Sequence, residues 1–459
     1  MLRHDTITAT ATPLGMSGIG IIRISGPEAL AVARRCFKPS SGKCSWKSHH
    51  LYHGDIICAD GKTVLDEVLI SFMRKPRSFT GEDVVEINCH GNPHIIGAIL
   101  TQLQELGCRP ARPGEFSERA FLNNRIDLSQ AEALSTMISA KSAKAYAVGL
   151  AQLKGSLRSE IDELRLLLIE ALALLETAID FTEDTPGETI PKIPPQINQA
   201  LEKIQTLLSS YSSARAYTEG INVIITGKPN VGKSSLFNAL TGRKKAIVTD
   251  IPGTTRDLIT DTINISGIPV RLIDTAGIRE PQNIIEKEGI SLVWESMAEA
   301  DVVIVILDVG NLLTDEDKII IGKNKSGKII AAINKIDLPR VWEAKTIEKL
   351  FPREAKILEI SAKSGEGLED LKKTIMDLTV SENSENADGA MIINLRHKLA
   401  IEKSFKNIQN AKESIAGGMS SEFAAFDLRE ALDSLDEITG KKINDEILDK
   451  IFSSFCIGK

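Results

Sequence analysis

The chain has 459 residues, of which 42% are hydrophobic and 25% are charged, so it is long enough for several buried cores and has the composition of a soluble globular protein. Its 55 basic and 62 acidic residues give a net charge of -7, which excludes a histone-like polycation. Any nucleic-acid partner must therefore be bound by local patches. Six cysteines without a C-x-x-C pair give no support for a zinc ribbon, and they fit a reducing cytoplasm. The most apolar helical stretch, 164–179, contains three charged residues, so we expect no membrane span.

Short β-rich runs alternate with Gly/Pro turns and helix-like pieces through the first quarter of the chain. This texture ends near Pro113 and Gly114. We therefore predict an α+β domain over 1–121. The expected strands are 20–24, 64–72 and 83–88, and the expected helices are 28–36 and 95–106.

Helical periodicity dominates two later parts of the chain. Between Leu150 and Ala178 apolar residues recur at spacings of three and four, which predicts one apolar stripe along a single long helix. Proline-rich residues 182–195 interrupt it, and a helical pattern resumes over 196–211. After a polar linker at 381–390, helical patterns return. We predict a discontinuous α-helical domain made of 122–215 and 381–459.

The segment between these parts, 216–380, alternates strands with helices. Its strand-like runs are apolar at nearly every position, as a parallel sheet with both faces covered requires. We therefore predict an α/β domain inserted into the helical one. The five runs are 221–226, 270–273, 302–307, 328–333 and 357–360.

A glycine-rich loop follows the first of these strands and precedes a helical run. Its sequence GKPNVGKS matches the phosphate-binding motif G-x-x-x-x-G-K-S in the required strand-loop-helix context. In that motif backbone N–H groups wrap the phosphates, the lysine neutralises them and the serine hydroxyl binds Mg²⁺. The alternative is an ordinary Gly-rich turn. The candidate residues are Gly227, Asn230, Val231, Gly232, Lys233, Ser234 and Ser235.

Three further motifs follow later strands in the order of a GTPase. Asn334, Lys335 and Asp337 follow one strand, where the Asp carboxylate can accept from N1–H and the exocyclic amine of guanine. Adenine offers no such donor pair. Together the motifs resemble the Ras-like translation-factor class of GTPases, which implies GTP hydrolysis coupled to a switch. The remaining candidates are Ser361, Ala362 and Lys363 for guanine O6, and Asp274, Thr275, Ala276 and Gly277 for Mg²⁺ and the γ-phosphate.

Ile278 stands where Ras-type proteins carry the glutamine that orients the attacking water. Catalysis must therefore be supplied differently. A potassium ion held by Asn230 and a nearby loop would stabilise the transition-state charge as an arginine finger does. The alternative is that Asn230 only stabilises the turn and the loop is an ordinary switch. The loop residues are Thr249, Asp250, Ile251, Pro252, Gly253, Thr254 and Thr255.

Stretches outside the GTPase segment closely resemble the MnmE (TrmE) family of tRNA-modification GTPases over essentially the whole chain. They are DTI at 5–7, GIGIIRISG at 18–26, FTGEDVVE at 79–86, RPGEFSERAFLN at 112–123 and FCIGK at 455–459. The resemblance implies an N-terminal folate-binding domain that is similar to aminomethyltransferases and dimerises the protein. It also implies a discontinuous helical domain and an inserted Ras-like α/β P-loop GTPase domain.

The resemblance further implies roles for individual residues. Arg23, Glu86, Lys459 and Arg125 occupy positions for 5-formyl- or 5,10-methylene-tetrahydrofolate. Glu286 corresponds to the carboxylate that helps to place catalytic water. Cys456 is either a packing thiol or a residue that works beside folate and substrate, and the resemblance favours the second. The implied metal ligands are Asn230, Thr249, Ile251 and Thr254 for K⁺, and Ser234 and Thr255 for Mg²⁺.

The leading hypothesis is a homodimeric cytoplasmic GTPase that modifies tRNA. With MnmG, a partner that brings FAD, it would form a heterotetramer and attach an aminomethyl or carboxymethylaminomethyl group to C5 of the wobble uridine. A second hypothesis is a ribosome-assembly GTPase, although the sequence has neither a KH-type G-x-x-G clamp nor a basic tail. A third is a free-standing aminomethyltransferase with a regulatory GTPase.

Overall fold

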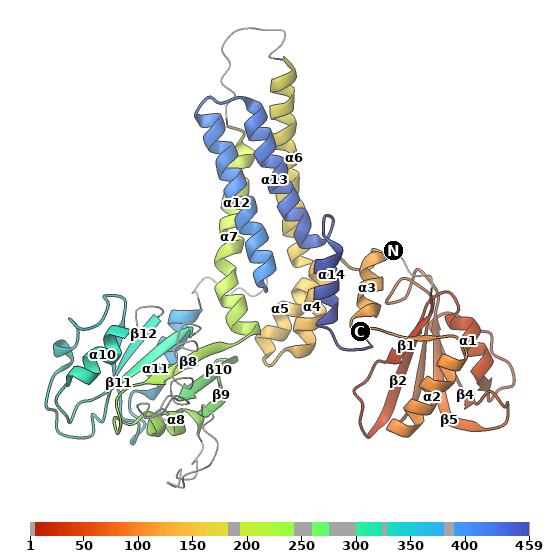
Figure 1. The fold of residues 1–459 in the computed structure, drawn as a ribbon, viewed down its shortest axis with the longest axis horizontal. Coiled ribbons are helices and arrows are strands. Elements are labelled where there is room, and N and C mark those ends of the chain that lie inside the picture. Colours follow the sequence, from red (N-terminus) through yellow and green to blue (C-terminus); the bar gives the residue numbers. More distant parts are fainter. Residues whose placement is uncertain are drawn as a thin grey trace, which may run out of the picture. The chain divides into compact units, whose positions relative to one another are not determined.

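A computed structural model of the chain describes residues 5–181, 193–242, 259–274, 300–323, 328–380 and 390–458. The chain forms two compact units, and each is built from segments that are far apart in sequence (Figure 1). The first unit contains Met1–Ser135, Gln152–Leu201 and Ala400–Lys459, and the second contains Thr136–Ala151 and Glu202–Leu399. Within the described residues no helix is long and apolar enough to cross a bilayer.

The first unit begins with a seven-stranded sheet whose order is β3-β4-β5-β6-β2-β1-β7. Its strands pair antiparallel, except that β1 and β7 are parallel. Alternate apolar residues of the strands pack against helices α1 and α2 and form one buried core. The expected strands and helices of this domain are confirmed. The bounds are β1 Ile7–Thr10, β2 Ser17–Ser25, α1 Ala29–Cys36, β3 Phe37–Pro39, β4 His50–Ile57, β5 Val64–Met73, β6 Val84–Gly91, α2 Pro93–Glu105 and β7 Arg109–Pro110.

Helices contributed by both ends of the chain complete the first unit. Helix α6 (Ser156–Phe181) lies beside α13 (Ser421–Thr439), as Figure 1 shows. Arg165 pairs with Asp436 at 2.6 Å, and Arg429 pairs with Glu176 at 2.6 Å. The helical domain is therefore discontinuous in sequence. Helices α3 Glu115–Leu122 and α14 Asp445–Ser453 also belong to this unit. Helices α4 Leu128–Ser139, α7 Pro195–Thr218 and α12 Leu395–Ala416 are divided between the two units, and α5 Ala143–Leu153 lies mostly in the second.

The single long helix expected from the stripe that begins at Leu150 is wrong. The chain forms α5 and then α6, with a turn at Lys154 and Gly155 between them. Gly155 has a φ of +95°, a left-handed conformation that ends a helix and that glycine adopts without steric cost. The stripe itself is buried along α6, at Leu157, Ile161, Leu164, Leu168, Ala171 and Leu175.

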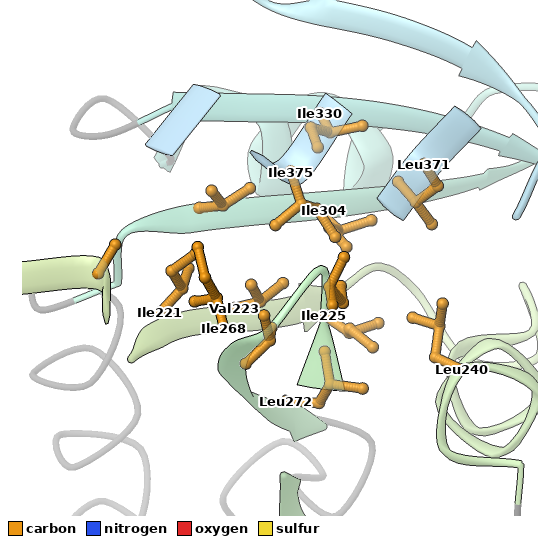
Figure 2. Packing of buried hydrophobic residues seen from close by; sticks show 14 of the residues in the cluster. Ile221, Val223, Ile225, Leu240, Ile268, Leu272, Ile304, Ile330, Leu371 and Ile375 are labelled. Atoms are coloured by element: carbon orange, nitrogen blue, oxygen red, sulfur yellow. The ribbon is translucent and has the colours of Figure 1, made fainter. Parts of the chain in front are cut away.

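The second unit contains a six-stranded sheet of order β13-β12-β11-β8-β10-β9. All neighbours are parallel except β9, which pairs antiparallel with β10 and which the sequence analysis did not include. Buried apolar side chains cover both faces of the sheet. Figure 2 shows one of these cores, where Ile225, Ile304 and Ile375 lie close together. The strands are β8 Ile221–Thr226, β9 Ile259–Ile265, β10 Ile268–Asp274, β11 Val302–Asp308, β12 Lys328–Asn334 and β13 Lys356–Glu359.

Helices α8 (Lys233–Thr241) and α11 (Leu368–Thr379) cover one face of this sheet, whereas α10 (Asp315–Lys323) and the short η2 (Ala344–Thr346) lie on the other. The same core extends beyond the sheet. Side chains of α5, of the end of α7 and of the segment before α12 pack into it, namely Val148, Ala214, Ala216, Tyr217, Met391 and Ile393.

Candidate functional site

The predicted phosphate loop, 227–232, joins the end of β8 to the first residue of α8. Gly227, Asn230 and Gly232 have φ values of +150°, +64° and +105°. A Cβ atom at Gly227 would lie 2.6 Å from the carbonyl oxygen of Ile306. Only glycine fits at that position, which explains the first glycine of the motif.

Lys233 is the first residue of α8, and its ammonium group folds back into the loop. Its Nζ donates to the carbonyl oxygens of Gly227 at 2.8 Å and Lys228 at 2.9 Å. Burial lowers the pKa of Lys233, and the carboxylate of Asp274 opposes that shift. Lys233 thus places a cation at a helix N-terminus, next to a loop in which two of the positive-φ residues are glycines. This is the arrangement that binds phosphate.

Ser234 and Asp274 provide hard oxygen ligands beside Lys233. The Ser234 hydroxyl donates to Oδ2 of Asp274 at 3.1 Å. Asp274 ends β10 and is only 1% exposed, so its carboxylate is held in place at the same edge of the sheet as the loop. Hydroxyl and carboxylate oxygens are the ligands that Mg²⁺ prefers, and the pair fits that ion.

The predicted guanine-binding residues converge on the phosphate loop. Asn334 donates through Nδ2 to the carbonyl oxygen of Val231 at 2.8 Å, and its Oδ1 accepts from the amide of Ala362 at 3.0 Å. The hydroxyl of Ser361 donates to Oδ1 of Asp337 at 2.7 Å. This hydrogen bond is the main reason that the pKa of Asp337 lies below its usual value, so the carboxylate is ionised at neutral pH.

Lys335 connects the base-binding motif to the phosphate loop through a carboxylate that the sequence analysis missed. Its Nζ donates to the carbonyl oxygen of Asn230 at 2.8 Å and to Oδ2 of Asp308 at 2.7 Å. Asp308 is 5% exposed. Burial alone would raise its pKa, but hydrogen bonds from Lys335, the Gly310 amide and Asn311 hold it below the usual value. Its position could have identified it, because Asp308, like Asp274, is the last residue of a strand whose carboxyl end lies at the site.

The sequence also offers no indication of an ion pair that joins the phosphate loop to α10. Lys228 Nζ pairs with Oδ2 of Asp317 at 2.8 Å. Asp317 lies on α10, is 2% exposed and also accepts from the amide and the hydroxyl of Thr314. The loop backbone is therefore anchored to α10 by one lysine and to the base-binding motif by another.

Several predicted residues lie outside the described part of the chain. These are Thr249, Asp250, Ile251, Pro252, Gly253, Thr254, Thr255, Thr275, Ala276, Gly277, Glu286 and Lys459. Asn230, the remaining predicted K⁺ ligand, is exposed, and its backbone faces Lys335. The predicted potassium site, the second Mg²⁺ ligand and the water-placing carboxylate stay predictions.

A second cluster lies in the N-terminal domain, where Arg23 of β2 is paired with Glu86 of β6. Arg23 Nε donates to Glu86 Oε1 at 2.9 Å. The guanidinium carbon of Arg23 lies 5.3 Å from the centre of the Phe79 ring and 5.7 Å from that of Phe116. Both aromatic residues belong to motifs of the sequence analysis but were not selected as site residues. Their approach to Arg23 depends on tertiary packing.

The end of the chain reaches the same cluster. Arg23 donates through a terminal nitrogen to the carbonyl oxygen of Gly458 at 3.4 Å, and the amide of Gly114 donates to the carbonyl oxygen of Cys456 at 3.4 Å. Gly458 has a φ of +93°, and a Cβ atom there would collide with the carbonyl oxygen of Thr10. The side chain of Cys456 is exposed. The structure thus places Arg23, Glu86 and the tail together.

Arg125 contacts the loop that leads to Phe79: its Nε donates to the carbonyl oxygen of Ser78 at 3.0 Å. Ser78 directly precedes Phe79. Aromatic rings, guanidinium groups and a carboxylate provide what a pterin with an anionic glutamyl tail requires: a flat apolar surface, an acceptor for ring N–H groups and cations for carboxylates. The residues present fit a folate.

Buried ion pairs fix helix α3, which carries Phe116. Arg119 is 5% exposed and pairs with Asp5 at 2.6 Å, Glu82 at 3.1 Å and Glu115 at 3.1 Å. Burial would raise the pKa of Glu115, but hydrogen bonds from Arg109 and from the Arg112 amide keep it below its usual value. The N-terminal strand and α3 are therefore tied together beside Arg23.

Comparisons with known proteins cover the whole chain. A family model described as the MnmE helical domain matches residues 128–456, and one described as the GTP-binding protein TrmE N-terminus matches residues 6–125. The tRNA modification GTPase MnmE of Syntrophus aciditrophicus is 46% identical over 455 residues, which are 99% of both chains. That of Carboxydothermus hydrogenoformans is 44% identical over 468 residues and 100% of both chains. Among solved structures, the G domain of the T. maritima FeoB iron transporter is 29% identical with a TM-score of 0.28, covering 34% of this chain and 98% of that one.

Proposed function

Because the chain belongs to the MnmE family of tRNA modification GTPases, we propose that it uses GTP hydrolysis to drive modification of the wobble uridine of certain tRNAs. With the FAD-dependent protein MnmG it attaches a carboxymethylaminomethyl or aminomethyl group at C5. A tetrahydrofolate derivative, 5-formyl or 5,10-methylene, supplies the one-carbon unit. The domain limits that we propose are 1–121, 122–215, 216–380 and 381–459.

The observation that carries the GTPase part is that the predicted base-binding motif and Lys233 contact the same loop. Val231, Asn230 and Gly227 are held by Asn334, Lys335 and Lys233 respectively. The phosphate loop and the base-binding motif are therefore hydrogen-bonded to each other, which supports a coupling of base recognition to phosphate positioning. This arrangement supports GTP as the substrate.

In hydrolysis, the loop amides and Lys233 hold the phosphates, and Asp337 accepts from the guanine. Ser234 and Thr255 would hold Mg²⁺, and Asn230, Thr249, Ile251 and Thr254 would hold K⁺. Bound there, these cations would supply positive charge against the negative charge of the transition state. Glu286 positions the water. This hydrolysis is stimulated by K⁺, and it drives dimerisation and separation of the two GTPase domains of the dimer, which gates the modification site.

In the N-terminal domain we propose that Arg23, Glu86, Arg125 and Lys459 bind the folate, with Phe79 beside the pterin. The exposed thiol of Cys456 lies two residues before Gly458, the residue that contacts Arg23, which supports a catalytic role next to the one-carbon unit.

A homodimer is the third part of the proposal. Leu51 on β4 and Leu69 on β5 are 64% and 43% exposed. They lie on neighbouring strands of the same sheet. Uncovered apolar side chains on a sheet are typical of an interface between protein chains, which supports pairing of two N-terminal domains. We propose that the dimer acts in the cytoplasm.

Mass spectrometry of nucleosides from bulk tRNA tests the proposal. A strain that lacks the gene is compared with its parent and with strains carrying the wild-type gene, Lys233→Ala or Cys456→Ser. We expect loss of the C5-modified wobble uridines in the deletion strain and recovery with the wild-type gene alone. The purified Cys456→Ser protein should hydrolyse GTP normally, which serves as the control. Persistence of the modified uridines in the deletion strain contradicts the proposal and favours a ribosome-assembly role.

A further inference from the structure

One part of the N-terminal domain is rich in cations although the whole chain carries a net charge of -7. Residues 29–54 include five Lys or Arg and no Asp or Glu, and residues 72–81 include three and none. All eight side chains are exposed. We call six of them the basic surface: Arg34, Lys43, Lys47, Arg74, Lys75 and Arg77.

Backbone contacts bring the two stretches together. The amide of Arg74 donates to the hydroxyl of Ser48 at 3.0 Å, and the amide of His49 donates to the carbonyl oxygen of Phe72 at 2.7 Å. Lys47, directly before Ser48, donates through its amide to the Tyr52 hydroxyl at 2.6 Å. The segment that carries Lys47 is therefore fixed beside the loop that carries Arg74, Lys75 and Arg77.

Aromatic side chains of the domain core pack against residues that carry this surface. The guanidinium carbon of Arg34 lies 5.9 Å from the centre of the Trp46 ring, which packs against Phe37 at 5.8 Å and Tyr52 at 5.9 Å. Trp46 is only 8% exposed, so its ring faces the core and is not available to stack on a base. The ring fixes Arg34 and the adjacent Lys47 in place.

The charges of the basic surface are not neutralised by carboxylates of the described residues, although Arg34 and Arg74 lie near the rings of Trp46 and Phe72. Across the residues that the structure describes, none of its six side chains forms an ion pair. Arg109 and Arg119 of the same domain, by contrast, pair with Asp5 and Glu115. Asp83 lies close to Lys75, but it accepts from the backbone amide of that residue at 2.9 Å. Ion pairs within the domain thus account for the presence of Arg109 and Arg119, but they do not account for the six cations of the basic surface.

We propose that the basic surface binds the phosphate backbone of tRNA. This inference rests on the proposed function, and it adds the place where the RNA is held. Because the chain as a whole is acidic, an RNA has to be bound by a local cluster of unpaired cations. With no exposed aromatic ring in the cluster, its contacts go to phosphates and not to bases, so they orient the RNA without reading its sequence.

The position of the basic surface supports this assignment. The loop that carries Arg74, Lys75 and Arg77 continues directly to Phe79, whose ring lies 5.3 Å from the guanidinium carbon of Arg23. An RNA held by the loop therefore lies against the same domain, a few residues along the chain from the cluster proposed to bind folate. Backbone contacts there would help to deliver a target uridine to that cluster.

Binding of an unmodified tRNA transcript to the full-length protein tests the inference. Fluorescence anisotropy is measured between about 50 and 200 mM salt for the wild type and for a triple variant, Arg74→Gln, Lys75→Gln, Arg77→Gln. A matched control, Lys345→Gln, Lys349→Gln, Arg353→Gln, removes the same charge from exposed residues of the GTPase domain that are interspersed with glutamates. GTP turnover and the circular dichroism spectrum verify that both variants are folded.

We expect the surface variant to bind tRNA at least tenfold more weakly and the slope of log affinity against log salt to become shallower by about two to three, one for each lost phosphate contact. The control variant should bind like the wild type. Equal binding by the surface variant overturns the inference. So does wild-type protein that prefers vesicles of anionic phospholipid to tRNA, because the cations then serve a membrane surface.

The nucleoside measurement separates the two proposals. If the deletion strain loses its modified uridines but the surface variant restores them fully, the proposed function stands and the basic surface is wrong. If the deletion strain keeps the modified uridines, the proposed function itself fails. Loss of modification in the deletion strain together with poor rescue by the surface variant supports both.

Discussion

A single hydroxyl holds Asp337, the residue that we predict to bind the guanine base. Ser361 donates to one carboxylate oxygen and lowers the pKa of Asp337, so under this prediction the second oxygen accepts from guanine. A carboxylate can accept from both N1–H and the exocyclic amine, whereas xanthine presents a carbonyl oxygen in place of that amine.

Replacement Asp337→Asn should therefore move the preference from GTP toward XTP, because an amide can donate to the carbonyl of xanthine. We expect kcat/KM for GTP to fall by roughly 10- to 100-fold, the loss of a hydrogen bond to a charged group. Steady-state hydrolysis of GTP and XTP by the two proteins measures this. Unchanged selectivity would show that Asp337 does not contact the base.

We predict that Asp308 affects nucleotide binding through Lys335. Its carboxylate holds the ammonium group that also caps the Asn230 carbonyl. Asp308→Asn keeps the shape but removes the charge, and we expect GDP to bind roughly 10- to 100-fold more weakly. Titration calorimetry with GDP measures the change. Asp315→Asn, which removes a carboxylate paired with Lys318 on the exposed side of α10, is the control and should have no effect.

At the scale of the elements, the C-terminal tail is docked through its own carbonyl oxygens: Gly458 accepts from the Arg23 side chain, and Cys456 accepts from the Gly114 amide. Gly458 adopts a φ of +93° and lies against the Thr10 carbonyl, so no other residue fits without moving the tail from Arg23. Gly458→Ala should abolish tRNA modification in the complementation strain while GTP turnover stays normal. Gly42→Ala provides the control, because Gly42 also has a positive φ, +72°, but nothing lies within 4 Å. Normal modification with Gly458→Ala would mean that tail docking is not required.

The strand-loop-helix arrangement of the GTPase segment could be predicted because phosphate chemistry dictates it. Gly227 and Lys233 have no substitutes at their spacing, and both lie where the motif places them. Asp308 and Phe79 could not be identified in the same way, since their roles depend on which distant residue packs against them. Sequence spacing alone does not contain that information.

Two element-level differences have local causes. The apolar stripe keeps its spacing across the Gly155 turn, so periodicity alone did not divide α5 from α6. Strand β9 was missed because it alternates polar and apolar residues at the edge of a sheet whose inner strands are apolar at nearly every position. An edge strand needs only one buried face. Both differences therefore arise where a pattern has more than one structural solution.

At the scale of the whole molecule, the phosphate loop lies in one compact unit and the Arg23 cluster in the other. GDP at 100 times its Kd stabilises the state that binds it by about 2.7 kcal/mol. We expect amide exchange in β11 to slow by up to roughly 100-fold, and exchange in β6 to stay unchanged. Exchange measured by mass spectrometry with and without GDP gives both values. Equal slowing in both strands would show that the units unfold together.

Helix α6 cannot pack against α13 until the ribosome has synthesised most of the chain. Arg165 and Asp436 are 271 positions apart, so the nascent chain completes α6 long before its partner helix exists. At about 5–20 residues per second, synthesis of the intervening chain takes on the order of tens of seconds. Throughout that interval the apolar stripe of α6 has no α13 to cover it, while the entire GTPase segment is translated. The stripe is therefore apolar surface that stays exposed to water or to other proteins until α13 has been synthesised.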